Sequence, residues 1–432
     1  AARTYARAGG AFLMQLFRNT VLICAFVAAA VITVVQFLRR GAAPSVSAGS
    51  TEALKDRPGH KAKHWVVKAI AFVVVVALGG FLFAASGIMP IKASSGHWPI
   101  TAWLLNFTMR RSVITHSLGM NAPKLDDAAL VAKGATHYEF GCRPCHGGPH
   151  LPQPVIAGHM TPHPPHLPPE IPKWQPEELF YIVKHGVKFT GMPAWPAQKR
   201  DDEVWAVVAF LLKIPKLTAQ EYLKVARSLK APAATIDDLT ESKQAPRIIT
   251  DNCARCHIVD NHARDLSVFP ILAGQRTEYL FASLLAFARG ERHSGIMQPL
   301  AASLTAKDMR EIAQYYGNLR GPSPAPVSVE IAPAIERGRE IALRGIPSRR
   351  VPACSACHGP NRVRRNPIYP ELAGQHSEYL ALQLELFNKQ SRGGTPYAHI
   401  MHRVAGRLTP QQMRDVTAYY GSLNSAAEPA AR

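Results

Sequence analysis

One five-residue pattern occurs three times in this sequence. Each copy has two cysteines separated by two residues, with a histidine directly after the second: Cys142–His146, Cys253–His257 and Cys354–His358. Cys-x-x-Cys-His is the attachment signature of c-type haem, in which the thiols bond to the haem vinyl groups and the histidine binds the iron. One copy alone is also compatible with a zinc site or a redox pair, but three copies use six of the seven cysteines. The sequence therefore predicts three covalently bound haem c groups and redox chemistry.

Each haem iron needs a second axial ligand, and methionine is the usual partner of histidine in electron-transfer cytochromes because it raises the potential. A methionine follows each motif at a similar interval. The usual role of a lone methionine is core packing, but the repeated position favours ligation. The predicted iron ligands are His146 with Met192, His257 with Met297, and His358 with Met401. The predicted sites of covalent attachment are Cys142, Cys145, Cys253, Cys256, Cys354 and Cys357.

Other side chains compete for the second axial position, so bis-histidine ligation stays open. Methionine is preferred in all three places because only the methionines share one position in each repeat. The competitors are Met160, His159 and His185 after the first motif, His293 after the second, and His399 and His402 after the third.

Prolines after the motifs suggest a second set of contacts. A backbone carbonyl near Pro270 or Pro370 is expected to accept the ring N–H of the ligand histidine and to fix its tautomer. Leu272 and Leu372 are expected to pack on the haem. After the first motif the proline-rich run 161–169 takes this place, and the sequence does not single out which of its residues accepts the bond.

The second and third motif regions repeat each other, which indicates duplicated domains. Residues 269–280 match residues 369–380, whereas the first region keeps the same order of features in a more divergent sequence. Apolar residues at helical spacing predict a closing helix in each region, at 201–213, 307–319 and 411–423. No strand pattern stands out, so the predicted fold class is all-α.

Two charge-free apolar runs precede the motifs. Residues 20–38 and 69–88 are each long enough to cross a ~30 Å hydrocarbon core as a helix. The segment between them is rich in Lys and Arg, which predicts that it is cytoplasmic and that the second helix leads to the periplasm. A signal peptide is the alternative for the first run. Cys24, inside that run, is expected to be a small buried hydrophobe.

The segment after the second run has the composition of a membrane interface. Residues 98–111 contain Trp98, Trp103, Arg110 and Arg111, and tryptophan and arginine are typical of that position. We expect an amphipathic helix there, lying at the periplasmic surface of the lipid bilayer.

The composition excludes some classes of function. The chain has 432 residues and a hydrophobic content of 47%, which rules out a disordered chain. Its formal charge of +20 is not gathered in one arm, so we expect no nucleic acid partner and attribute the charge to a solvated surface and membrane-flanking residues. Covalent haem attachment places the motif regions outside the cytoplasmic membrane of a bacterium.

The haem motifs and later methionines resemble those of class I c-type cytochromes, over roughly residues 126–424. The last two regions look like the tandem cytochrome c4 or c553 type, on the strength of Leu272–Gln275, Tyr279–Leu280, Ile296–Met297 and their counterparts. A membrane-bound three-haem chain also resembles the cytochrome subunits of bacterial periplasmic dehydrogenases. That resemblance implies electron flow from alcohol, aldehyde or sugar-acid oxidation to ubiquinone.

These observations predict five parts of the chain. They are a first transmembrane helix with its basic cytoplasmic loop (1–62), a second transmembrane helix with the interfacial segment (63–125), and three cytochrome c domains (126–230, 231–325 and 326–432).

The expected function is that of an electron-transfer subunit in the bacterial inner membrane, not catalytic alone, with its haem domains on the periplasmic side. It would carry electrons from the catalytic subunit of a periplasmic dehydrogenase to ubiquinone or another membrane acceptor. One alternative is a membrane-tethered electron donor to a terminal oxidase or reductase. Another is a peroxidase-like haem enzyme, which needs a vacant or displaceable iron ligand.

Overall fold

The computed structural model describes residues 58–88, 91–228, 246–254, 256–257, 269–319, 321, 329–359 and 366–424. The first predicted membrane span, with Cys24, lies outside the described residues. The chain divides into two compact units, Ala1–Ser95 and Gly96–Arg432, which are described separately. All three Cys-x-x-Cys-His motifs belong to the second unit.

Among its described residues, the first unit has one long helix, α2 (Pro58–Ala85). Its part Val67–Ala85 is the one stretch among the described residues that is long and apolar enough to cross a membrane, and its side chains are not buried within the protein. The helix predicted at residues 69–88 is confirmed as far as Ala85, but α2 begins earlier than predicted, at Pro58. The run of valines suits an apolar environment, where an α-helix satisfies all its own backbone hydrogen bonds.

The second unit begins with α3 (Pro99–Ser117), whose first residue is a proline that presets the helical φ. One side of α3 packs against α7 (Pro176–His185) and buries Val113 and Ser117. The helix predicted at residues 98–111 is present and extends further, because its last turns are held by this packing.

The first motif region is a bundle of helices around its own apolar core. Helix α4 crosses α8 where Gly134 meets the backbone carbonyl of Ala206, so closely that a Cβ at this glycine would overlap that carbonyl. The core includes Tyr138, Phe210 and Tyr222, all buried. The helices are α4 (Ala128–His137), α5 (Arg143–His146), α6 (Leu167–Glu170), α7, α8 (Asp201–Leu211) and α9 (Ala219–Ser228).

The second and third motif regions have separate cores of related construction. In the third region Gly338 of α14 meets the backbone of Asp415 in α18, the same close crossing as in the first region. The helices of the second region are α11 (Thr277–Ala288), α12 (Met297–Ala302) and α13 (Ala306–Asn318). Those of the third are α14 (Ala332–Arg344), α15 (Ser355–His358), α16 (Ser377–Asn388), α17 (Ala398–Ala405) and α18 (Pro410–Ser422).

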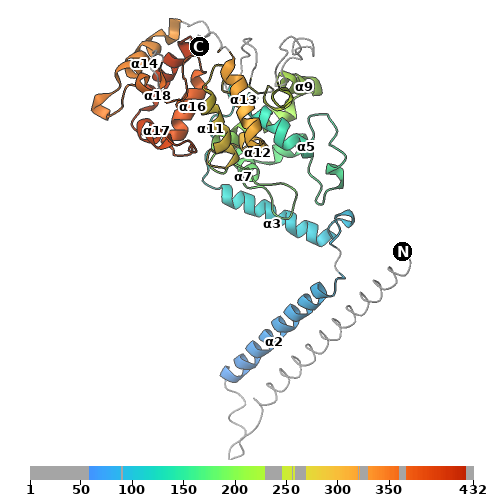
Figure 1. Ribbon diagram of the computed structural model, residues 1–432. Helices are drawn as coiled ribbons and strands as arrows, with labels where there is room; N and C mark the ends of the chain where they lie inside the picture. The colour runs from blue at the N-terminus through green and yellow to red at the C-terminus, as the bar shows by residue number, and fades with distance from the viewer. Residues whose placement is uncertain are drawn as a thin grey trace, which may run out of the picture. The chain divides into compact units, whose positions relative to one another are not determined.

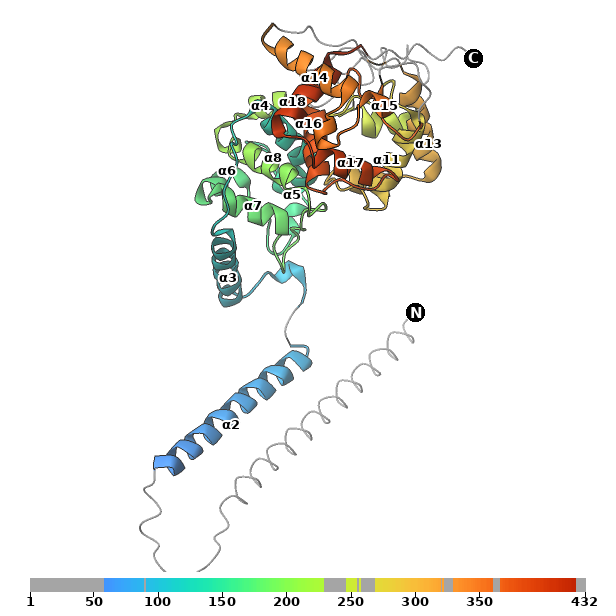
Figure 2. The ribbon, with the colours of Figure 1, turned by 90° about the vertical axis from the view of Figure 1, so that its left-hand side faces the viewer.

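The second and third regions pack side by side in both views (Figures 1 and 2). Two glutamines hold the contact in a reciprocal way. The amide of Gln275 donates to the carbonyl of Glu371 and accepts from its N–H, both at 2.9 Å. Gln375 makes the same pair of bonds with Ile271, at 2.9 and 3.0 Å. This exchange is the arrangement expected of a duplicated domain that pairs with its copy.

The predicted all-α fold is confirmed for the described residues, which form helices and no strand beyond two isolated backbone bridges. The three closing helices occur as predicted, each displaced by at most two residues at its ends.

Candidate haem-binding site

A single cavity of about 1040 Å³ runs through all three motif regions and is lined by residues from each. Its volume exceeds the ~300–1,000 Å³ of a common small-molecule pocket. Every cysteine, histidine and methionine predicted to hold a haem lines this cavity. The structure therefore brings the twelve predicted site residues to one place, although they are spread over more than half of the chain.

The three motif histidines are oriented in the same way. The Nδ1–H of His257 donates to the carbonyl of Pro270 at 3.0 Å, and that of His358 donates to the carbonyl of Pro370 at 2.9 Å. These two contacts confirm the sequence prediction. The bond fixes the tautomer and leaves Nε2 free to bind a metal.

In the first region the accepting carbonyl belongs to Pro165, which lies 2.9 Å from Nδ1 of His146. Gln153 supports this loop, because its amide donates to the carbonyl of the adjacent Pro164 at 2.9 Å. Burial lowers the pKa of all three motif histidines, which keeps the rings neutral, as metal ligation requires.

Three buried tyrosines support the motif backbones and were not predicted from the sequence. Tyr138 donates to the carbonyl of Gly147 at 2.7 Å, and Tyr420 donates to that of Gly359 at 2.9 Å. Tyr316 donates to the carbonyl of His257 at 3.2 Å. The repeated Tyr-Tyr-Gly at residues 315–317 and 419–421 was the available signal for two of them.

The first thiol of each motif lies in surroundings that suppress its ionisation. Burial raises the pKa of Cys142 to about 12 and that of Cys253 and Cys354 to about 11. A zinc site needs thiolates with further ligands close by, and among the described residues no group of three His, Cys, Asp or Glu side chains gathers to hold a metal. The chemistry of the cysteines at these positions fits thioether attachment better than thiolate ligation.

The rivals for the second axial position differ in where they lie. Among the third-region candidates only Met401 lines the cavity, while His402 Nε2 is 2.6 Å from the carbonyl of Arg392. In the first region His185 is exposed and packs on Tyr181. Met160 and His293 line the cavity together with Met192 and Met297, so these two remain competitors.

Two arginines in the cavity wall form a buried cationic cluster between the second and third regions. Arg292 donates to the hydroxyl of Tyr379 at 3.2 Å, and Arg392 donates to the hydroxyl of Tyr279 at 2.9 Å. Burial, together with the neighbouring Arg292, lowers the pKa of Arg392, but an arginine stays charged in a protein. Buried charge needs a counter-charge, and the carboxylates of haem propionates would supply it here. The residues present therefore fit haem c.

Comparison with known proteins also supports haem c as the cofactor. The family model described as cytochrome c oxidase, cbb3-type, subunit III matches residues 129–211, and the cytochrome c model matches residues 335–424. A thiosulfate dehydrogenase electron acceptor of Thiomonas intermedia is 34% identical over 165 residues, which are 38% of this chain and 75% of that protein.

Two further relatives have related names. Cytochrome c4 of Thiocapsa roseopersicina is 31% identical over 174 residues, covering 40% of this chain and 87% of that protein. The cytochrome subunit of sulfide dehydrogenase of Chlorobaculum tepidum is 36% identical over 90 residues, covering 20% of this chain and 78% of that protein. In all three cases this chain covers most of the relative, and the relative covers a minority of this chain.

Proposed function

Because this chain belongs to the multi-haem c-type cytochromes, and is homologous to cytochrome c4 and to the electron acceptors of thiosulfate dehydrogenase, we propose that it is a membrane-anchored electron relay with three haem c groups. Electrons enter from a periplasmic dehydrogenase and leave to ubiquinone or another membrane acceptor. The observation that carries the proposal is the continuous cavity, which all three motifs line.

In this proposal the motif cysteines hold each haem covalently, and His146, His257 and His358 bind the irons from one side. Met192, Met297 and Met401 bind from the other side. Two protein ligands leave no position for oxygen or peroxide, so the bound haem supplies one-electron chemistry and no catalysis. The protein contributes orientation through the proline carbonyls, and counter-charge through Arg292 and Arg392.

Two features support attachment to the inner membrane with the haem regions in the periplasm. The first is α2, whose apolar stretch Val67–Ala85 is long enough to span the bilayer. The second is an exposed apolar stripe on α3, on the side away from the packed face. The stripe consists of Ile100, Trp103, Leu104, Phe107 and Ile114. Aromatic and aliphatic side chains so placed suit the bilayer interface.

The donor is the less defined end of the relay. The names of the relatives favour a dehydrogenase of an inorganic sulfur compound over the alcohol or aldehyde dehydrogenases that the sequence resemblance suggested. The proposal needs a dehydrogenase partner in either case, because an electron relay takes its electrons from another protein.

The partner is tested by isolating the full-length holoprotein from its native membrane with mild detergent and identifying the subunits that accompany it. We expect a dehydrogenase catalytic subunit, and we expect that adding the substrate of that enzyme reduces the haems in the isolated complex. Recovery of the chain alone, unreduced by thiosulfate, sulfide or alcohols with their dehydrogenases, would contradict the proposed donor.

A second function is favoured by one observation, the match of residues 129–211 to subunit III of cbb3-type cytochrome c oxidase. In that case the chain is a tethered donor to a terminal oxidase. Oxidation of the reduced holoprotein by oxidase-containing membranes, at a rate unaffected by a quinone-site inhibitor, would favour this function. Exposure of the reduced holoprotein to carbon monoxide tests the peroxidase-like alternative, because stoichiometric binding requires a vacant iron position.

A further inference from the structure

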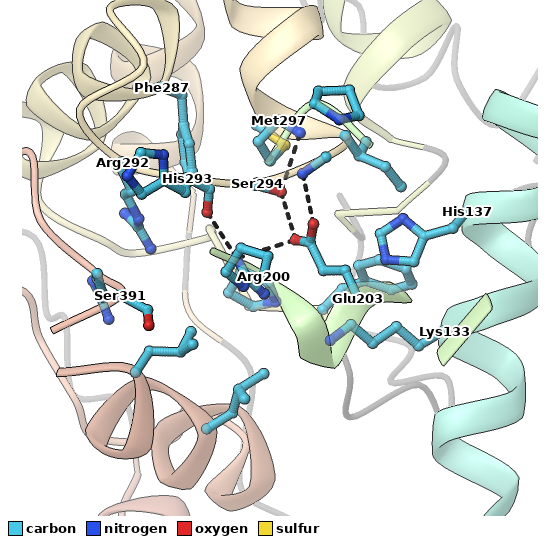
Figure 3. Close-up of a pocket in the computed structure, with 18 of the residues that line it drawn as sticks. Lys133, His137, Arg200, Glu203, Phe287, Arg292, His293, Ser294, Met297 and Ser391 are labelled. Atoms are coloured by element: carbon cyan, nitrogen blue, oxygen red, sulfur yellow. Dashed lines mark hydrogen bonds and ion pairs between the residues drawn. The ribbon is translucent and has the colours of Figure 1, made fainter. Parts of the chain in front are cut away.

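The first and second regions meet at a buried carboxylate. Glu203 lies on α8 of the first region and is 2% exposed. Its Oε1 accepts a bond from Ser294 Oγ at 2.9 Å, and its Oε2 accepts one from the backbone N–H of Gly295 at 2.6 Å. Figure 3 shows Glu203 pointing from α8 toward Ser294, in the loop that leads to Met297. A side chain of the first region is thereby bonded to the loop before Met297 in the second region. We call this loop, and the one around Met192 in the first region, the methionine loops.

The same carboxylate also holds its own region's methionine loop. Trp195 follows Met192 by three positions, and its indole Nε1–H donates to Glu203 Oε2 at 3.2 Å. The guanidinium of Arg200 pairs with Glu203 Oε1 at 3.0 Å and donates to the carbonyl of His293 at 2.8 Å. Four donors from two regions therefore gather on one buried carboxylate.

The two methionine loops touch directly. The indole ring of Trp195 packs on the Cα of Gly295 so closely that a Cβ at this position would overlap the ring. Ser294 links this contact to the next turn, because its hydroxyl accepts the N–H of Met297 at 3.3 Å. The two loops that carry the predicted ligands Met192 and Met297 are thus in van der Waals contact through Trp195 and Gly295.

The position of Glu203 in its helix is used for capping in the other two closing helices, whereas in α8 it is available for this contact. In α13 and α18 the third residue caps its own helix: Asp308 bonds back to Thr305, and Gln412 bonds back to Thr409. Glu203 is the third residue of α8, but the residue before α8 is Arg200, and it makes no side-chain cap. The helix position that caps its own helix in the second and third regions therefore bonds, in the first region, to the neighbouring second region.

The contact between the first and second regions also supplies hydrogen-bond partners for the buried charge of Glu203. A buried carboxylate is costly without partners, and two of the four donors to Glu203 come from the second region. Burial alone would lower the pKa of Arg200, but the carboxylates of Glu203 and Asp202 outweigh it and raise that pKa. Without the second region, Glu203 would lose the donors Ser294 and Gly295 and keep only Trp195 and Arg200.

We propose that Glu203 is a positioning residue that holds the methionine loops of the first two regions together, and that one electron passes between these regions at the Trp195–Gly295 contact. This inference rests on the proposed relay and adds which haem regions exchange electrons directly, namely the first and the second. In each passage a ferrous iron on one side is oxidised and a ferric iron on the other is reduced. No proton or bond is transferred.

Two variants of the full-length holoprotein test the role of the contact. Glu203→Gln replaces one accepting oxygen by an NH₂ group, which faces donors and cannot accept their bonds. Gly295→Ala places a methyl group against the indole ring and separates the loops without changing the side chain of Glu203, at a glycine that is outside the left-handed region. The matched controls are Asp308→Asn, at the equivalent helix position, and Gly158→Ala, where a Cβ meets open space.

The first measurement is hydrogen exchange at the amide of Gly295, which is independent of electron transfer. We expect Glu203→Gln to speed exchange roughly tenfold, since the amide loses a charged acceptor, and Asp308→Asn to leave exchange unchanged. Unchanged exchange in Glu203→Gln would overturn the positioning role.

The second measurement is the rate of electron redistribution. A photosensitiser on a cysteine introduced at Val155, which is 81% exposed in the first region, injects one electron, and freeze-quenched paramagnetic resonance follows the ferric signals. We expect both variants to slow the step between the first two haems roughly tenfold and to leave haem content unchanged. An unaltered rate in both variants would overturn the electron junction. No dehydrogenase is present, so this result is independent of the partner proposed above.

Discussion

At the residue scale, the site depends on how each histidine and methionine is held. Three proline carbonyls fix Nδ1 of the motif histidines, and three buried tyrosines bind the backbone carbonyls at or just after them. The proline carbonyls lie 12 to 19 residues after their histidines, and the bonds of Tyr316 and Tyr420 span 59 and 61 residues, whereas that of Tyr138 spans only 9. The ligand geometry is therefore a property of each folded region and is set before its partners bind.

The assignment of Met297 as an iron ligand is tested by Met297→His. Histidine stabilises ferric iron more than thioether sulfur does, so we expect the potential of one haem to fall while the other two are unchanged. Redox titration measures this. Met309→Leu is the control, because Met309 is buried in the core of the same region. A titration curve unaltered by Met297→His would favour His293 as the ligand.

His137 makes the first region sensitive to acid. Its ring is buried, and neither nitrogen has a hydrogen-bond partner among the described residues. Burial lowers its pKa to about 4. Between about pH 6.5, where an unfolded histidine protonates, and about pH 4, the unfolded state binds more protons than the folded state. Stability therefore falls as the pH drops through this window, by up to about 3 kcal/mol.

We expect His137→Phe, which keeps the edge contact with Trp195, to flatten this dependence. The measurement is the unfolding midpoint of the first region across the window, followed by tryptophan fluorescence. The control is His150→Gln, which removes an exposed histidine of the same region. An acid dependence that survives in His137→Phe would show that another group causes it.

The residues that bear chemistry were predictable because haem attachment fixes their spacing. The motifs, the later methionines and the carbonyls of Pro270 and Pro370 follow from repeated positions. Pro165 was not predictable, because its proline-rich loop has no counterpart in the other two regions. Glu203 was missed for a physical reason: acidic residues are common in the first turn of any helix, and only the fold reveals that this one reaches another region.

At the element scale, the first and third regions share one helix crossing, of α4 with α8 and of α14 with α18. Gly134 in α4 and Gly338 in α14 each let the backbone of the closing helix approach closely. The boundaries of the three closing helices were predictable to within two residues from apolar periodicity. The extension of α3 to Ser117 was not, since it depends on packing against α7 and not on its own sequence.

Gly338→Ala tests the crossing. The added methyl group would overlap the carbonyl of Asp415, and a backbone atom cannot move aside as a side chain does. We expect the third region to lose about 1–3 kcal/mol of stability, the usual cost of overpacking, as measured by denaturant unfolding. Gly158→Ala, with its Cβ in open space, should change stability by much less. A neutral effect of Gly338→Ala would mean that the helices separate without cost.

At the scale of the whole molecule, the second and third regions form a symmetric pair, to which the first region is joined by a different device. Gln275 and Gln375 each form hydrogen bonds to the other region of the pair. The first region contacts the pair through Glu203. The duplication was visible in the sequence. The junction was not, because it joins residues 91 and 92 positions apart with no repeat to mark them.

The central claim is that this chain carries three one-electron haems with protein ligands on both sides of each iron. Coulometric titration of the purified full-length holoprotein tests it most directly, with iron content determined on the same sample. We expect reversible uptake of three electrons per chain and three irons per chain, with no spectral change when carbon monoxide is added to the reduced protein. Uptake of fewer than three electrons, or stoichiometric binding of carbon monoxide, would contradict the account.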